Sequence, residues 1–338
     1  MLRDPEGITV FVPNWLGDVA MSTPALRTLH QRYPDADLTV VGRAGACALL
    51  KGLEFIDRFV TIPTRPGLRS MFGLRRELRS SSSDMSVVFP HSFRAALLAR
   101  LSGHDRVLGY DRGFRRHLIT DLVEPNRVEG EIVPVYMVWE YLDLLQPLGC
   151  DYDGFGLELH ADERSVAEVQ EHIIGEGPLV GFAPGAAFGP SKQWPVERFA
   201  LAADILAREL NARCVLLTGP GEESTRDQFL DLCACDPIVC DEGNPTIESL
   251  KATVSLLDLL VCNDSGPRHV AIAFNVPVVC VMGSTRPVYS EGPYERGEVL
   301  RIDVDCGPCQ KPVCSTDHRC MTGVQVDRVV ESARKFLI

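Results

Sequence analysis

The feature of this chain that most constrains its fold is an alternation of short β-rich runs with helical segments, which restarts halfway along. In the first half the β-rich runs are ITVFVP, DLTVVG, FVTIP, MSVVFP and DRVLGY, with segments such as TPALRTLHQRY between them. In the second half they are PLVGFAPG, RCVLLTGPG, PIVCDEG, LDLLVCNDSG and VPVVCVMGS. Such alternation is typical of parallel sheets covered by helices on both faces. The sequence therefore predicts an α/β protein with two Rossmann-like units in tandem.

The length of the chain agrees with two domains, because 338 residues exceed the usual size of one. We place the boundary in the linker and helix around residues 150–178, and take 1–158 as the first domain and 159–323 as the second. The last helix, 324–338, is a candidate for packing back on the first domain.

Composition and charge exclude several classes. No apolar run approaches the ~18 to 20 residues of a membrane span, and Arg3, Asp4 and Glu6 precede a first apolar run that lacks the length and basic flank of a secretory signal. The expected location is therefore cytoplasmic. A net charge of −12 argues against nucleic acid as a partner, because a phosphate backbone calls for a basic surface.

Arginine is nevertheless concentrated in one stretch, residues 61–120. It holds eleven arginines against four acids. An acidic chain with such a stretch either presents it to an anionic ligand or membrane surface, or carries it as a solvated, locally paired surface. The two interpretations have similar weight here. The arginines are Arg65, Arg69, Arg75, Arg76, Arg79, Arg94, Arg100, Arg106, Arg112, Arg115 and Arg116.

Doubly wound sheets bind ligands beyond the carboxyl ends of their strands, so the loops after the strands are informative. In FAPGAAFGPSKQWP, Lys192 follows a glycine-containing loop, and amides at a helix start together with a lysine suit a phosphate. In LLTGPGEESTRDQF, Glu222 and Glu223 open the next helix, where they either serve function or merely complement the helix dipole.

The loop in LLVCNDSGPRHVAIAF combines helix-capping residues with a glycine and a proline at the helix start. Asp264, Ser265 and Gly266 form this turn, and His269 lies one turn into the helix. Taken alone, the pattern indicates a good cap and little more, and a histidine in that position is more often structural than catalytic.

Several enzyme classes are excluded by missing motifs. The sequence contains no G-x-S-x-G elbow, Walker loop, kinase signature or H-E-x-x-H. The loop after the first strand is PNWLGD rather than G-x-G-x-x-G, which disfavours a conventional dinucleotide dehydrogenase. The D-x-D pattern of metal-dependent sugar transferases occurs three times in scattered contexts, as chance would produce, so we expect no catalytic metal or other catalytic cofactor.

Three segments together resemble a known family. WLGDVAMSTPALRTL, PGAAFGPSKQWP and NDSGPRHVAIAFNVPVV stand in the order and at roughly the spacing of glycosyltransferase family 9, the ADP-heptose:lipopolysaccharide heptosyltransferases. The resemblance covers nearly the whole chain. It implies a GT-B fold, in which two Rossmann-like domains face each other across a cleft, with the acceptor bound mainly by the first domain and ADP-heptose by the second.

The resemblance also implies roles for single residues. Asp18 matches the general base of an inverting, metal-independent transfer, and Gly17 beside it lets the acceptor approach. Lys192 is expected to neutralise the charge that develops on the departing ADP. The donor-binding residues implied are Gly185, Glu222 or Glu223 at the ribose, and Asp264, Ser265, Gly266 and His269 at the diphosphate and sugar.

The same resemblance gives the arginine-rich stretch a function. The inner core of lipopolysaccharide carries Kdo carboxylates and lipid phosphates, which arginine binds in bidentate fashion. We expect Arg94, Arg112 and Arg115 to contact this acceptor, and we expect peripheral association with the inner face of the bacterial inner membrane.

Four of the twelve cysteines crowd together in CGPCQKPVCSTDHRC. In a reducing compartment such spacing favours a structural zinc site over disulfides, although reduced thiols and a disulfide pair remain alternatives. Four thiolates would close the coordination sphere, so catalysis by that zinc is not expected. We call this set the four-cysteine cluster: Cys306, Cys309, Cys314 and Cys320.

Two other functions fit the same architecture. A sugar-nucleotide 2-epimerase would need additional acid and base groups around one substrate. A non-catalytic binding protein would use Asp18 merely as a helix cap. Analysis of the products from an ADP-sugar separates all three.

Overall fold

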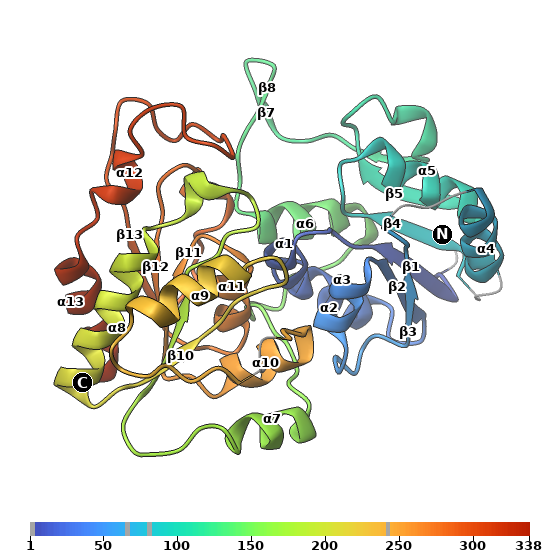
Figure 1. Ribbon diagram of the computed structural model, residues 1–338. Helices are drawn as coiled ribbons and strands as arrows, with labels where there is room; N and C mark the ends of the chain where they lie inside the picture. The colour runs from blue at the N-terminus through green and yellow to red at the C-terminus, as the bar shows by residue number, and fades with distance from the viewer. Residues whose placement is uncertain (1–3, 65–67, 80–82, 241–243) are drawn as a thin grey trace. The chain divides into compact units, whose positions relative to one another are not determined.

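The computed structural model describes residues 4–64, 68–79, 83–240 and 244–338. The chain divides into two compact units, Met1–Leu157 and Glu158–Ile338, and each contains one parallel sheet with helices packed against it (Figure 1). This division lies within one residue of the boundary expected between the domains.

The first unit has a six-stranded parallel sheet in the order β3-β2-β1-β4-β5-β6. This is the Rossmann order, with the chain reversing direction of growth between β1 and β4. All residues of β1 are buried, as expected for a central parallel strand. The strands are β1 Gly7–Phe11, β2 Asp37–Gly42, β3 Arg58–Thr61, β4 Met85–Val88, β5 Arg106–Tyr110 and β6 Asp121–Val123, with β7 Arg127–Val128 and β8 Glu131–Ile132 forming a separate antiparallel pair.

The predicted helical segment TPALRTLHQRY forms α2, Thr23–Arg32. Ser92 caps α5 by accepting a hydrogen bond from the backbone N–H of Ala95, and Gly103 ends that helix with a φ of 86°, a left-handed conformation that suits glycine. The helices are α1 Leu16–Met21, α2 Thr23–Arg32, α3 Ala44–Leu50, α4 Leu68–Arg79, α5 Phe93–Ser102 and α6 Met137–Leu145, with 3₁₀ turns η1 Arg116–Leu118 and η2 Gln146–Leu148.

The second unit has a five-stranded parallel sheet in the order β10-β9-β11-β12-β13. The strand expected at PIVC is reduced to a single parallel bridge between Val215 and Ile238. With that bridge at the outer edge, the order repeats the Rossmann pattern of the first unit. The strands are β9 Leu179–Ala183, β10 Arg213–Leu216, β11 Leu259–Asn263, β12 Val278–Val281 and β13 Gly297–Leu300.

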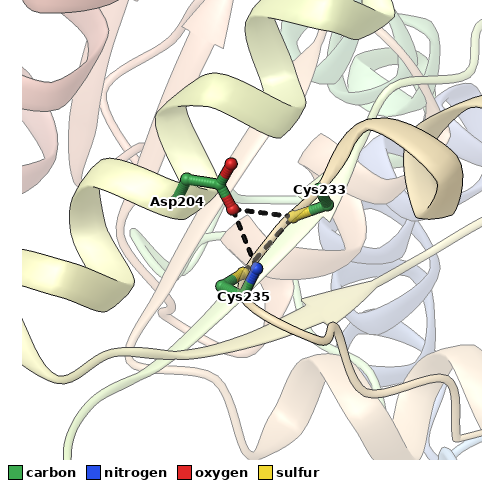
Figure 2. Close-up of side chains that lie close together, drawn as sticks. All are labelled: Asp204, Cys233 and Cys235. Carbon is green, nitrogen blue, oxygen red and sulfur yellow. Dashed lines mark hydrogen bonds between the residues drawn. The ribbon is translucent and has the colours of Figure 1, made fainter.

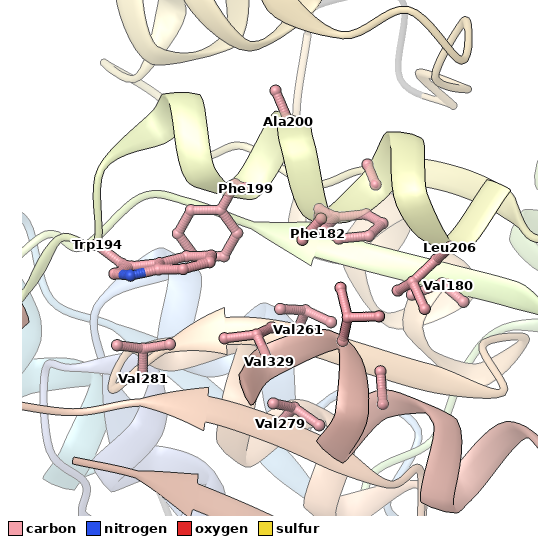
Figure 3. Close-up of a cluster of buried hydrophobic side chains, with 14 of the residues drawn as sticks. Val180, Phe182, Trp194, Phe199, Ala200, Leu206, Val261, Val279, Val281 and Val329 are labelled. Carbon is pink, nitrogen blue, oxygen red and sulfur yellow. The ribbon is translucent and has the colours of Figure 1, made fainter. Parts of the chain in front are cut away.

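The core of the second unit lies between one face of this sheet and three helices, α8, α9 and α13 (Figure 3). Alternate strand residues such as Phe182, Val261 and Val279 point into it, because successive side chains of a strand face opposite ways. Trp194 is fully buried there. The helices are α7 Glu163–Gln170, α8 Val196–Leu210, α9 Glu223–Leu232, α10 Ile247–Ser255, α11 Gly266–Ala273, α12 Arg319–Thr322 and α13 Val326–Leu337, with η3 Pro190–Lys192 and η4 Pro287–Tyr289.

The last helix corrects one expectation. α13 is part of the second unit, where it contacts α8, β11, β12 and β13, and Val329, Val330 and Ala333 join that core. Its apolar stripe is matched by the apolar face of the sheet of its own unit, so packing there removes it from water. Within the described ranges, no helix has the length and apolar character needed to cross a bilayer.

Candidate functional site

In the first unit, the candidate base lies at the carboxyl edge of the sheet. Asp18 is the third residue of α1, the helix that begins just beyond β1, and it is half-buried beside the buried Gly17. Burial raises the pKa of the Tyr141 phenol, on α6, well above its usual value, and the negative charge of Asp18 adds to the increase. The position therefore agrees with a carboxylate that follows a central strand, where ligands of such sheets bind.

A second group of polar side chains lies at the same edge, and only its arginine was predicted. Glu140 of α6 is buried, and its Oε1 lies 2.9 Å from Nε2 of His91 and 3.0 Å from a terminal nitrogen of Arg112. His91 follows β4 and Arg112 follows β5, two neighbouring strands on one side of β1. A polar residue directly after a strand was the available signal for His91, whereas nothing local distinguished Glu140.

The three predicted acceptor arginines differ in their exposure to solvent. Arg94 is exposed in the first turn of α5, and Arg112 is partly buried against Glu140. Arg115 is fully buried and donates hydrogen bonds to the backbone carbonyls of Tyr110 and Pro90. A guanidinium enclosed in this way stabilises the loop after β5 and has no surface to offer an acceptor, so we withdraw Arg115 from the acceptor set. Of the other arginines, Arg65 lies outside the described residues.

In the second unit, Lys192 and Asp264 form one ion pair although they are far apart in sequence. Lys192 Nζ lies 2.7 Å from Asp264 Oδ2 and donates to the Asp264 carbonyl at 3.0 Å. Asn263 positions the two loops, because its side chain accepts from the N–H of Trp194 at 2.9 Å and donates to the Pro184 carbonyl at 2.7 Å. The carboxyl ends of the adjacent strands β9 and β11 are thereby joined.

Asp264 has further partners that sequence reasoning missed. Its Oδ1 accepts from Arg268 at 2.9 Å and from the Ser290 hydroxyl at 3.1 Å, and its Oδ2 accepts from the Thr285 hydroxyl at 2.7 Å. Burial alone would raise the pKa of the Asp264 carboxyl, but the charges of Lys192 and Arg268 outweigh it and hold that pKa well below its usual range. Asp264 is therefore ionised at neutral pH.

Arg268 is the centre of the buried part of this network. It is fully buried and makes a bidentate pair with Glu295, at 2.8 Å from Nε and 2.6 Å from a terminal nitrogen. No role was predicted from the sequence for Arg268 or for Glu295, which lies in the loop between η4 and β13. The pairing depends on the approach of that loop to α11, which no local pattern reveals.

The start of α11 offers polar groups without partners. Ser265 occupies the N-cap position, and its hydroxyl is buried and has no hydrogen-bond partner among the described residues. The same is true of Nδ1 of His269. Burial, together with the charge of Arg268, lowers the pKa of His269 to about 3, so its imidazole is neutral at neutral pH. Free amides at a helix start suit an anion, and His269 can add a hydrogen bond but no charge.

The two candidate ribose acids differ clearly. Glu222 precedes α9, its carboxylate accepts from the N–H of Gly219 at 2.8 Å, and a methyl group added at Gly185 would lie 2.0 Å from it. Glu223 is exposed and accepts from the N–H of Gly221 at 3.1 Å. Glu222 is thus the acid held against the loop after β9, and a side chain at position 185 would force its carboxylate to move.

The four-cysteine cluster lines a small cavity of about 60 Å³ together with His318 and Ser191. The sulfurs of Cys306 and Cys314 lie 3.7 and 3.4 Å from the Thr316 hydroxyl. No three of the cluster's ligand atoms are mutually within 4.8 Å, whereas one other group of described residues is, Asp204 with Cys233 and Cys235. A closed tetrahedral zinc site needs sulfurs about 3.8 Å apart, so the four-cysteine cluster does not fit that geometry as it stands.

The chain is similar to known proteins in both sequence and fold. Residues 71–319 match glycosyltransferase family 9 (heptosyltransferase). The chain is 27% identical to lipopolysaccharide heptosyltransferase 2 of Escherichia coli K12, over 98% of both chains, and 24% identical to lipooligosaccharide heptosyltransferase 2 of Campylobacter jejuni, again over 98% of both. It is similar to the solved structure of E. coli ADP-heptose lps heptosyltransferase II, with a TM-score of 0.81, 25% identity and 98% of each chain covered.

Proposed function

The chain belongs to glycosyltransferase family 9, and from that premise we propose that it transfers a heptose from ADP-heptose to the inner core of lipopolysaccharide. The observation that carries the proposal is the end-to-end similarity to lipopolysaccharide heptosyltransferase 2. The second unit supports it, because the Lys192–Asp264 pair, the start of α11 and Glu222 all lie beyond the carboxyl ends of neighbouring strands. A cation, free amides and a carboxylate suit the diphosphate and ribose of an ADP-sugar.

In the proposed reaction, the acceptor hydroxyl oxygen attacks the anomeric carbon of the heptose as the bond from that carbon to the ADP oxygen breaks. The hydroxyl proton passes to the Asp18 carboxylate, and the sugar is transferred with inversion. ADP leaves with the negative charge of the broken bond. Lys192 stabilises that charge.

Lys192 can turn toward a diphosphate while the Asp264 carboxylate keeps other hydrogen-bond partners. When Lys192 moves away, Asp264 Oδ1 still accepts from Arg268 and Ser290, and Oδ2 still accepts from Thr285. Because the buried carboxylate keeps these three partners, the free-energy cost of losing the lysine is much smaller than that of an unpaired buried charge. We infer that Asp264 holds Lys192 in place in the free enzyme and that no catalytic metal is needed.

The test is to incubate the protein with ADP-heptose and a panel of truncated core acceptors. We expect ADP release and heptose incorporation into acceptors that end in heptosyl-Kdo. Isomerised ADP-sugar without an acceptor would instead identify a 2-epimerase, and the absence of any turnover of ADP-heptose would identify a binding protein. Either result overturns the proposal.

A matched pair of variants tests the ribose contact. We expect Glu222→Ala to raise the KM for ADP-heptose by ~10 to 100-fold, the scale of a lost hydrogen bond to a charged group. Glu223→Ala should change it by less than about twofold, because Glu223 is exposed and bonds the N–H of Gly221. Initial rates against ADP-heptose concentration give both constants, and a larger effect for Glu223 would reverse the assignment.

A second matched pair tests acceptor binding. Arg94 and Arg100 are both exposed on α5, but Arg94 lies at the end that follows β4 and Arg100 in the last turn, about 9 Å further along the helix. We expect Arg94→Ala to raise the acceptor KM by about threefold to tenfold without affecting ADP-heptose, and Arg100→Ala to change neither. The acceptor KM of the wild type should rise with ionic strength more steeply than the donor KM. Equal salt slopes and an unchanged acceptor KM in Arg94→Ala would return these arginines to the solvated-surface interpretation.

Two further expectations stay proposals. We propose peripheral association with the inner face of the inner membrane through the exposed arginines of the first unit, since anionic lipid attracts such side chains. Structural zinc at the four-cysteine cluster also stays a prediction, and it requires the sulfurs to move together when the metal binds.

A further inference from the structure

Three ligand-type side chains outside the proposed donor site lie close together where α8 meets the end of α9. Cys233 is the residue that follows α9, and its sulfur lies 3.3 Å from Oδ1 of Asp204 on α8 and 3.3 Å from the sulfur of Cys235 (Figure 2). Asp204 Oδ1 also accepts from the backbone N–H groups of Ala234 and Cys235 at 2.8 and 2.9 Å. The carboxylate therefore fixes the loop that presents both thiols.

A third thiol adjoins this group. Cys214 of β10 is buried. Its hydrogen bond to Cys235 is the main cause that raises the pKa of the Cys235 thiol to about 12, and burial of Cys235 adds to the increase. The hydrogen bond between Cys233 and Cys235, with burial, raises the pKa of Cys233 further still. Two thiols and one carboxylate thus gather where α8 meets the end of α9, with no role in the reaction described above.

The spacing of these atoms suits a metal better than a disulfide. Zinc bonds of about 2.3 Å to sulfur and about 2.0 Å to oxygen place two tetrahedral sulfurs about 3.8 Å apart and a sulfur and an oxygen about 3.5 Å apart. Both separations here are 3.3 Å, so the ligand atoms move apart by about 0.2 to 0.5 Å when a metal binds. A disulfide would need the two sulfurs about 2.05 Å apart, which is a much larger movement.

We propose that Asp204, Cys233 and Cys235, whose ligand atoms all lie within 4.8 Å of one another, form a binding site for a thiophilic divalent cation of the zinc class. On binding, the sulfur–hydrogen bonds of the thiols are replaced by sulfur–metal bonds and the protons leave to solvent, with no electron transfer. The metal joins α8 to the C-terminal end of α9. Glu222 stands at the other end of that helix, so the site steadies the element that carries the proposed ribose contact.

The experiment is a Co²⁺ titration of the reduced full-length protein, followed by absorbance and by dialysis for metal content. Two double variants separate the possible sites, Cys233→Ser with Cys235→Ser, and Cys306→Ser with Cys314→Ser. Cys150→Ser removes a buried thiol of the first unit and serves as the control. We expect cobalt–thiolate absorption in wild type, Cys150→Ser and the Cys306/Cys314 variant, and loss of one bound equivalent in the Cys233/Cys235 variant.

Asp204→Asn keeps an oxygen acceptor for the two backbone N–H groups while removing the charge. It should stay folded by circular dichroism and bind Co²⁺ at least about tenfold more weakly. An unchanged cobalt equivalent and spectrum in the Cys233/Cys235 variant overturns the proposal, as does absence of cobalt–thiolate absorption from the Cys306/Cys314 variant.

Discussion

Replacement of Asp18 by Asn is expected to lower kcat for heptosyl transfer by ~10² to 10⁴-fold, the range for removal of a general base. The amide has nearly the same shape as the carboxylate but cannot take the acceptor proton. Because the donor is assigned to the second unit, the affinity for ADP-heptose should not change.

The measurements are kcat from initial rates of ADP release and the dissociation constant of ADP-heptose from calorimetry. Asp35→Asn, an exposed residue of the same unit, is the matched control and should behave as wild type. Turnover of Asp18→Asn close to wild type would remove Asp18 from the mechanism. A parallel loss of donor affinity would instead indicate a structural role for α1.

Removal of Lys192 should have the second largest effect. We expect Lys192→Ala to lower kcat by about 10² to 10³-fold, the scale of a lost charge-stabilising contact in the transition state. The loss should not come from unfolding, because Asp264 keeps Arg268, Ser290 and Thr285 as partners. A melting temperature within a few degrees of wild type would support this separation of effects.

Lys335→Ala is the control, since Lys335 pairs with Glu298 on the surface and should leave kcat unchanged. The wild-type initial rate should be equal with EDTA and with added Mg²⁺. A rate that EDTA abolishes and Mg²⁺ restores would contradict the role given to Lys192, because a hard cation would then be carrying the charge of the leaving group.

Several candidate residues were found from sequence because their positions follow from local patterns. The apolar runs predicted β1, β9 and β11, and in a parallel sheet the residues after the strands gather at one edge. That rule led to Asp18, Lys192 and Asp264. The family resemblance then supplied roles that capping statistics alone would have assigned to helix ends.

Contacts between distant residues escaped the same reasoning. Arg268 and Glu295 are 27 residues apart, and Lys192 and Asp264 are 72 apart. Nothing in either segment encodes the approach of the other. Glu140 was missed for this reason, since its partners His91 and Arg112 come from loops after two different strands.

Local patterns in the sequence were enough to predict the α/β class, the two units and the loops that hold the candidate site, because strand and helix periodicity are local properties of side-chain polarity. The three-dimensional packing sets which charged residues are enclosed and which face water. It buried Arg115 against backbone carbonyls, packed α13 on the second unit, and brought Cys233 and Cys235 to Asp204. Burial and pairing depend on which surfaces meet across the fold, and that is settled by the packing of whole elements.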